Sequence, residues 1–210
     1  MIDKKGLSLL LSRLKTFGNP KAEYEQYQTP SELAALALWR AYMDGNIENK
    51  TATDLGCGTG IFGIGALILG AKKAIFVDAD EDALKVAREN KEYIESIIKK
   101  KVNALFVNKE INEFKGKSDM VIENPPFGVK KPHIDKMFLN VAMKTAPIIY
   151  SFHKIESKEF IDKFAIDNGY KVTSIEKVKF PLKAIFKFHR KKNYFVETGL
   201  WKIEKSNRKV

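Results

Sequence analysis

A short apolar run, Met120 to Ile122, leads into a rigid turn that carries an amide: Asn124-Pro125-Pro126-Phe127-Gly128. Two consecutive prolines hold φ at about −65° and remove two backbone donors, so neither a strand nor a helix continues through them. Because proline also holds the preceding residue extended, we expect the Asn124 amide to project from the end of a strand. An amide that donates and accepts hydrogen bonds, close to a flat ring, suits a planar substrate that bears an amino group. A plain strand-ending turn with a buried phenylalanine is the alternative interpretation.

A glycine-rich turn, Asp54-Leu55-Gly56-Cys57-Gly58-Thr59-Gly60, follows another β-prone run. Glycines permit positive φ and let a ligand approach the backbone closely. Together with Gly63 the turn also satisfies the dinucleotide pattern G-x-G-x-x-G. The carboxylate of Asp54 would repel a pyrophosphate and attract an ammonium group, whereas Asp78, at the next strand end, suits a ribose diol in either case. A tight turn that binds nothing is the third interpretation.

A basic segment near the C-terminus, residues 183–192, interleaves aromatic side chains with cations. That combination is typical of surfaces that bind single-stranded or flipped nucleotides, with cations on phosphates and rings on bases. Phe186 and Phe188, two residues apart, fit core packing equally well. The residues that we predict to contact RNA are Lys130, Lys131, Lys187, Phe188, His189, Arg190, Lys191 and Lys192.

The elements that must position these residues follow from the apolar patterns. Helices are expected over 7–16, 30–44, 61–69, 81–99, 134–145 and around Phe160 to Ala165, and strands over 51–55, 74–77, 102–107, 120–122, 147–152, 171–180 and 194–203. Strand and helix alternate until the last two strands, which have no helix between them. This order predicts an α/β fold: a doubly wound, mostly parallel seven-stranded sheet with a C-terminal antiparallel hairpin. Ligands bind at the carboxyl ends of strands in such sheets, and four polar residues lie there: Asp54, Asp78, Asn108 and Asn124.

Length and charge limit the classes of protein. The 210 residues predict one structural unit, with an N-terminal helical extension over 1–50 and the main domain over 51–210. A net charge of +11 and a pI near 9.5 favour a polyanion such as nucleic acid, although a lysine-rich thermophilic surface would look similar. The single cysteine, Cys57, excludes an internal disulfide and fits a reducing cytoplasm. The longest apolar run, Ile61 to Ala71, is too short to span a bilayer.

The three histidines, at positions 133, 153 and 189, lack the spacing of metal ligands, so no metal site is predicted. His153 follows an apolar strand and is interpreted as a core histidine without a catalytic role.

Six stretches together carry a family resemblance. Asp54 to Gly60 resembles motif I of class I S-adenosylmethionine-dependent methyltransferases, and Asn124 to Phe127 resembles motif IV of the subset that methylates planar amino or amide nitrogens. Four more stretches resemble, more narrowly, the methyltransferase-like family that includes the N6-adenosine methyltransferase of small-subunit ribosomal RNA. These stretches are Glu25 to Pro30, Asp80 to Leu84, Ser151 to Lys154 and Lys187 to Lys192. The resemblance runs from about Leu7 to the C-terminus.

The resemblance implies a Rossmann-like fold, S-adenosylmethionine as cofactor and a set of roles. Asn124, Pro125, Pro126 and Phe127 would be catalytic, and Gln26 and Thr29 would fold over the cofactor. Asn108 stands where the family usually has aspartate, and its carbonyl can still accept from the cofactor's adenine amine. Eukaryotic relatives work with a small zinc-ribbon activator, so such a partner is an expectation here. The implied cofactor residues are Gln26, Thr29, Asp54, Gly56, Cys57, Gly58, Gly60, Phe62, Asp78, Ala79, Asn108 and Lys109.

The reaction implied is methyl transfer to N6 of an adenosine in structured RNA. Two alternatives keep the chemistry and change the substrate: N5-methylation of a release-factor glutamine, and methylation of adenine in DNA. Release-factor enzymes typically end the motif in tyrosine and carry a separate N-terminal helical domain, and fifty residues before the first strand are short for one. A third alternative is a catalytically silent, RNA-binding ribosome-assembly factor that holds the cofactor.

Overall fold

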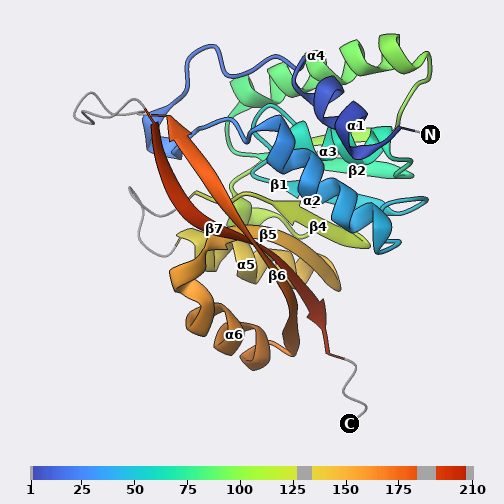
Figure 1. Cartoon of the computed structure of the whole chain (residues 1–210). Coiled ribbons are helices and arrows are strands. Elements are labelled where there is room, and N and C mark those ends of the chain that lie inside the picture. The colour runs from blue at the N-terminus through green and yellow to red at the C-terminus, as the bar shows by residue number, and fades with distance from the viewer. Residues whose placement is uncertain (1, 127–133, 184–192, 207–210) are drawn as a thin grey trace.

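The computed structural model describes residues 2–126, 134–183 and 193–206 of the chain (Figure 1). Its helices are α1 (Lys4–Leu11), α2 (Ser31–Met43), α3 (Ile61–Ile68), α4 (Glu81–Ile98), α5 (Ile134–Thr145) and α6 (Lys158–Asp167), with short 3-10 turns η1 (Ala22–Tyr24), η2 (Ile111–Glu113) and η3 (Ile155–Ser157). Its strands are β1 (Thr51–Leu55), β2 (Lys73–Asp78), β3 (Ala104–Asn108), β4 (Met120–Glu123), β5 (Ile148–Lys154), β6 (Tyr170–Lys183) and β7 (Asn193–Lys205).

All seven strands form one sheet in the order β3-β2-β1-β4-β5-β7-β6. Strands β1 to β5 run parallel, whereas β7 pairs antiparallel with both β5 and β6. The predicted parallel sheet with its C-terminal hairpin is thus confirmed. Because Leu55 is in register with both Val77 and Glu123, the carboxyl ends of β1, β2 and β4 lie level at the point where the strand order reverses.

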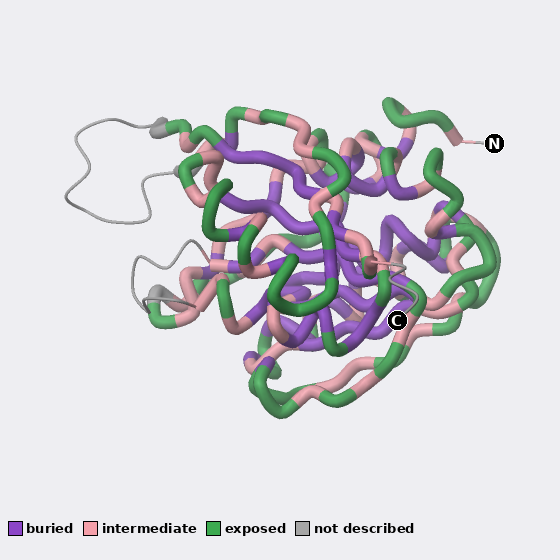
Figure 2. The backbone as a smooth tube through the Cα atoms, turned by 90° about the horizontal axis from the view of Figure 1, so that it is seen from below, coloured by how far each residue is buried: buried purple, intermediate pink, exposed green. Residues whose placement is uncertain are grey.

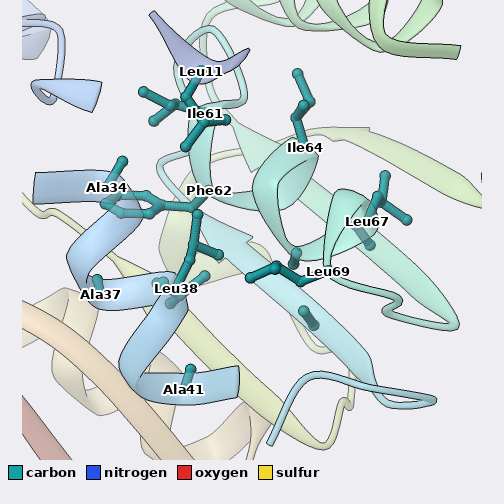
Figure 3. Packing of buried hydrophobic residues seen from close by; sticks show 14 of the residues in the cluster. Leu11, Ala34, Ala37, Leu38, Ala41, Ile61, Phe62, Ile64, Leu67 and Leu69 are labelled. Carbon is teal, nitrogen blue, oxygen red and sulfur yellow. The ribbon is translucent and has the colours of Figure 1, made fainter. Parts of the chain in front are cut away.

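Helices cover both faces of the sheet, and the buried chain lies between them (Figure 2). One cluster of apolar side chains joins α1, α2, α3 and α4 to the sheet, and a second joins α5 and α6 to the opposite face. The first fifty residues share the first cluster. Figure 3 shows how α2 and α3 pack through Ala34, Leu38 and Phe62, all of which are buried.

An aromatic row connects the C-terminal hairpin with the N-terminal segment. Phe180 of β6 is fully buried and meets Tyr27 edge-on, with 5.6 Å between the ring centroids. Phe180 also meets Phe152 of β5 at 6.1 Å, and Phe152 stacks on Phe62 of α3 at 6.1 Å. These four rings therefore link the hairpin, the sheet and α3 to the segment before α2.

Two local expectations were wrong. The first helix begins at Lys4 and not at residue 7, because the Asp3 side chain caps it by accepting from the Gly6 amide at 2.7 Å. On α4, the apolar residues of the sequence pattern include Ile97, which is nevertheless 43% exposed, while Glu95 is buried. Within the described residues, no helix has both the length and the apolar character to cross a bilayer.

Candidate active site

A cavity opens at the carboxyl ends of β1, β2 and β4 and is closed on one side by residues 23–29, which we call the N-terminal cover. It holds about 970 Å³ of empty space, part of it open to solvent, which is large enough for a nucleoside-sized ligand. Of the predicted site residues, those that line it are Gln26, Thr29, Gly56, Cys57, Gly58, Phe62, Asp78, Ala79, Asn124 and Pro126.

The glycine turn after β1 fixes a carboxylate at the cavity wall. Gly58 has φ +52°, and its amide donates to Asp78 Oδ2 at 2.7 Å. A Cβ at Gly58 would lie 2.7 Å from the Phe17 ring, so the position requires glycine both for conformation and for space. The second oxygen of Asp78 accepts from the Asp80 amide at 2.9 Å. Asp78 is thereby oriented before any ligand binds.

The N-terminal cover is tied to the start of α4 through Asp80. Lys21 Nζ and Gln26 Nε2 each donate to this carboxylate at 2.7 Å. Burial raises the pKa of Asp80, but these two hydrogen bonds outweigh it, so the pKa lies below the usual range. Gln26 also accepts from the Lys21 amide through Oε1 at 2.8 Å. Both ends of the Gln26 side chain therefore hold the cover in place.

Asp54 lies beneath the turn and does not line the cavity. It is 1% exposed, and its Oδ2 accepts from the Gly63 amide at 2.8 Å. Its Oδ1 has no hydrogen-bond partner among the described residues. Burial raises the pKa of Asp54 to about 7.

The Asn124 turn presents two acceptors. Asn124 Nδ2 donates to Thr29 Oγ1 at 3.0 Å, while Asn124 Oδ1 is buried and has no partner in the described part of the chain. The carbonyl of Pro125 accepts from the Tyr27 hydroxyl at 3.1 Å. Asn124 lines the cavity and Pro125 does not, so the carboxamide oxygen of Asn124 is the acceptor that an amine entering the cavity can reach.

Asn108 and Lys109 lie apart from the cavity. Asn108 is exposed, and its Nδ2 donates to the carbonyls of Asp78 and Ala79 at 3.2 and 2.9 Å. The Lys109 amide donates to the Asp78 carbonyl at 3.0 Å. Their contacts join the end of β3 to the end of β2.

Several cavity residues were missed by sequence reasoning. Phe17 and Tyr27 come from stretches without periodicity, and Met137 and Phe138 belong to the apolar pattern of the helix expected over 134–145. Some predictions cannot be placed, because these residues lie outside the described ones: Phe127, Lys130, Lys131, Lys187, Phe188, His189, Arg190, Lys191 and Lys192.

Behind the Asn124 turn lies a buried polar row, Glu123, Ser151 and His153. Ser151 Oγ donates to Glu123 Oε1 at 2.8 Å and lies 2.7 Å from His153 Nε2. His153 is 2% exposed, and burial lowers its pKa to about 4, so it is neutral at physiological pH. No group of three His, Cys, Asp or Glu side chains in the described chain could hold a metal ion.

The fold and cavity define the class of protein. The solved structure of magnesium protoporphyrin IX methyltransferase from Synechocystis PCC 6803 with bound SAM matches the fold with a TM-score of 0.66, at 15% identity over 98% of this chain and 99% of the other. The family profile described as "Ribosomal protein L11 methyltransferase (PrmA)" matches residues 35–125, the half that contains the glycine turn. The chain thus has the Rossmann-like fold of S-adenosylmethionine-dependent methyltransferases.

Full-length comparisons give the family. The crystal structure of a candidate RNA methyltransferase from Pyrococcus horikoshii aligns with a TM-score of 0.87 and 40% identity, covering 98% of this chain and 99% of that one. rRNA N(6)-adenosine-methyltransferase METTL5 of Danio rerio is 35% identical over 92% of this chain and 94% of its own length. Its Caenorhabditis elegans counterpart, metl-5, is 30% identical over 98% and 99%. The chain belongs to this rRNA N6-adenosine-methyltransferase family.

Proposed function

We propose that this protein transfers the methyl group of S-adenosylmethionine to N6 of an adenosine in RNA, with small-subunit ribosomal RNA as the substrate. The observation that carries the proposal is the buried Oδ1 of Asn124, a residue that lines the cavity, because this oxygen has no partner among the described residues; we propose the carbonyl of the next residue, Pro125, as the second acceptor. An exocyclic amine brings two N–H groups, and these two oxygens are its complement. The full-length relatives named as rRNA N6-adenosine methyltransferases support the same reaction.

The residues present fit the cofactor. Asp78 is held at the cavity wall, where a carboxylate can accept from a ribose diol, and the glycine turn exposes backbone to a close ligand. When bound, the cofactor supplies an electrophilic sulfonium methyl group. The protein's own part is to position the amine and to stabilise the charge that develops on it.

Asn124 and Pro125 would do this work. The N6 lone pair of adenine is delocalised into the ring, and two acceptors on its N–H groups favour tetrahedral geometry at nitrogen. The same acceptors stabilise the positive charge that grows there as the methyl group is transferred. No strong base is required. Phe127 is proposed to stack on the base, a contact worth about 1–3 kcal/mol, after the adenosine leaves its own stack.

Asn124→Ala is the direct test. The variant removes one acceptor from the reacting amine, so methylation of small-subunit rRNA should fall by about a hundredfold or more. Transfer of labelled methyl groups measures turnover, and calorimetry measures cofactor binding, which should persist. Asn168→Ala, which deletes an amide contact to the Phe164 carbonyl at the end of α6, is the matched control. Methylation by Asn124→Ala at the wild-type rate would contradict the catalytic assignment.

The RNA surface is proposed to be the basic residues Lys130, Lys131, Lys187, His189, Arg190, Lys191 and Lys192, with Phe188 on a base. Phosphate contacts of this kind release counterions, so RNA affinity should fall steeply with salt.

Other substrates are separated by one assay. The match to the ribosomal protein L11 methyltransferase profile covers residues 35–125, so it includes the glycine turn and ends within the Asn124 turn. Labelled cofactor incubated in parallel with rRNA, tRNA, DNA, ribosomal protein L11 and release factor tests each alternative. Label in rRNA alone supports the proposal; label in protein or DNA would replace it, and no label with bound cofactor would indicate a silent assembly factor.

Two further expectations belong to the same proposal. A small zinc-ribbon activator would bind β3, because this strand is the parallel edge of the sheet and its Leu105 is 43% exposed. Raised activity of the purified chain on addition of such a protein tests this. A cytoplasmic location is supported by the free thiol of Cys57, the chain's single cysteine.

A further inference from the structure

Two hydroxyl groups of the N-terminal cover hold the two polar groups of the Asn124 turn. Thr29 lies 95 residues before Asn124 and Tyr27 lies 98 residues before Pro125, yet both form hydrogen bonds with the turn. Gln26, on the same cover, is anchored to Asp80 at the start of α4. The cover thus links the cofactor side of the cavity to the turn that faces the substrate.

Thr29 holds the nitrogen end of the Asn124 amide, and Tyr27 also forms a hydrogen bond with this side chain. Its Oγ1 lies 3.0 Å from Asn124 Nδ2 and accepts from it. Thr29 is 6% exposed, so solvent does not readily replace this contact. With the nitrogen held there, the oxygen is the free end, and Oδ1 has no partner among the described residues. A rotated amide would present N–H groups to an amine that has only N–H groups to offer.

Tyr27 holds the second acceptor. Its hydroxyl donates to the Pro125 carbonyl at 3.1 Å, and a carbonyl oxygen retains a second lone pair for another donor. Burial raises the pKa of Tyr27, and the charge of Glu25 adds to this, while a hydrogen bond with the Asn124 side chain acts the other way. The phenol therefore remains protonated and remains a donor over the physiological pH range. Its ring is held by the edge contact with Phe180.

We propose that Thr29 and Tyr27 are positioning residues for methyl transfer: Thr29 sets the amide orientation of Asn124, and Tyr27 sets the direction of the Pro125 carbonyl. The inference rests on the proposed function and deepens it. It also gives Thr29 a role toward the nucleophile beside the cofactor contact that the family resemblance implies. The placement of the cover and the orientation of the two acceptors then depend on the same contacts.

Thr29→Val tests the first half. Valine keeps the shape and removes the acceptor, so kcat should fall about ten- to a hundredfold because the Asn124 amide is no longer held. The Kd for S-adenosylmethionine and the KM for rRNA should change far less than kcat. Thr29→Ser restores the oxygen and should recover most of kcat. Thr145→Val is the matched control, since it deletes a buried threonine hydroxyl that donates to the Val141 carbonyl at the end of α5.

Tyr27→Phe tests the role of Tyr27 toward the Pro125 carbonyl. This variant should lower kcat far more than it changes the Kd for S-adenosylmethionine. Its control is Tyr170→Phe, which removes a buried phenol that donates to the Ala146 carbonyl. Parallel losses of cofactor affinity and activity in Thr29→Val and Tyr27→Phe would overturn the inference and leave both residues as cofactor contacts. Wild-type kcat in both variants would overturn it as well.

Failure of the inference is distinguishable from failure of the proposed function. If Asn124→Ala is inactive while Thr29→Val and Tyr27→Phe are fully active, only the positioning role is lost. If Asn124→Ala itself retains wild-type turnover, the catalytic assignment fails first. A lowered kcat in Thr29→Val that Thr29→Ser does not restore would indicate a packing effect, and would also count against the positioning role.

Discussion

Glu123 is a carboxyl group in the core, directly before Asn124. It is fully buried, its Oε1 accepts from Ser151, and its Oε2 has no partner in the described residues. Burial raises the pKa of Glu123 to about 8, the Ser151 hydrogen bond acts in the opposite direction, and the charge of Asp54 raises it further. The side chain is therefore neutral at physiological pH, which is the form that tolerates an apolar site.

The pH dependence of stability follows from this raised pKa. Between an unfolded pKa near 4.5 and the folded value of about 8, the folded state keeps a proton that the unfolded state has lost. The contribution of Glu123 to the free energy of unfolding is thus fully present below pH 4.5. It is lost as pH rises through 8, at about 1.4 kcal/mol per pH unit. Urea unfolding of the wild type and of Glu123→Gln between pH 5 and 9 measures this dependence. The free energy of unfolding should fall less steeply with pH in the variant than in the wild type. Equal slopes would contradict a buried neutral Glu123.

Sequence reasoning at the residue scale succeeded where the backbone dictates position. The ends of β-prone runs placed Asp78 and Asn124 at the cavity, because ligands bind where the parallel strands of such a sheet stop. It could not find Tyr27 or Thr29 as partners of the turn, since contacts between residues 95 and 98 positions apart leave no local pattern. The buried state of Asp54, away from the cavity wall, depends on packing around α3 and was equally out of reach.

At the scale of elements, Glu95 joins the end of α4 to the start of β3. Its Oε1 accepts from the Val102 amide at 2.9 Å, and Lys91 and Lys101 pair with it at 2.7 and 2.8 Å. Burial acts to raise the pKa of Glu95, but the hydrogen bonds from Lys101, Lys91 and Val102 outweigh it and hold the pKa at about 2. The carboxylate therefore stays charged and fixes the chain reversal after Lys99, which has φ +52°.

Glu95→Ala should destabilise the fold by about 1–3 kcal/mol, because it leaves the Val102 amide without its charged acceptor. The exposed Glu92→Ala on the same helix is the control and should be near neutral. Because folding lowers the pKa of Glu95, its contribution to the free energy of unfolding is present above pH 4.5 and is lost as pH falls through 2. Denaturant unfolding of both variants measures it, and equal stabilities would show that the link is dispensable.

Elements with strong periodicity or β-branched runs were predicted within two residues, as for β1, α4 and α5. The misassigned face of α4 has a physical cause: Glu95 enters the core side because an amide and two lysines neutralise it, and Ile97 lies outside the helix's contact with the sheet. A hydrophobic pattern alone cannot anticipate a carboxylate that is satisfied by a loop.

At the scale of the whole molecule, the net charge of +11 should govern RNA affinity. Reversing Arg190, Lys191 and Lys192 to Glu should weaken rRNA binding and reduce the slope of log affinity against log salt by about two to three. Reversing Lys4, Lys5 and Arg13, which are exposed on and after α1, changes net charge equally and is the control. Filter binding across a salt series measures both. If the two triple variants behave alike, the basic segment has no special role beyond its charge.

The division at residue 50 remains a prediction, but the packing favours treating the chain as one structural unit. Leu7, Leu38 and Ile47 lie in the same buried cluster as Phe62 of α3. Chain length predicts one structural unit. It could not predict that the first fifty residues would supply part of the core and the cover of the cavity.

The row of four rings has a consequence for how this chain can vary. Tyr27, Phe180, Phe152 and Phe62 belong to four segments that are remote in sequence, and each fills space left by the next. A smaller residue at position 180 would free the Tyr27 ring, so it should be tolerated only together with a bulkier neighbour. Among natural variants we therefore expect positions 27 and 180 to change in concert, and a library randomised at both to return size-compensated pairs. The hairpin and the N-terminal cover would then share one evolutionary history.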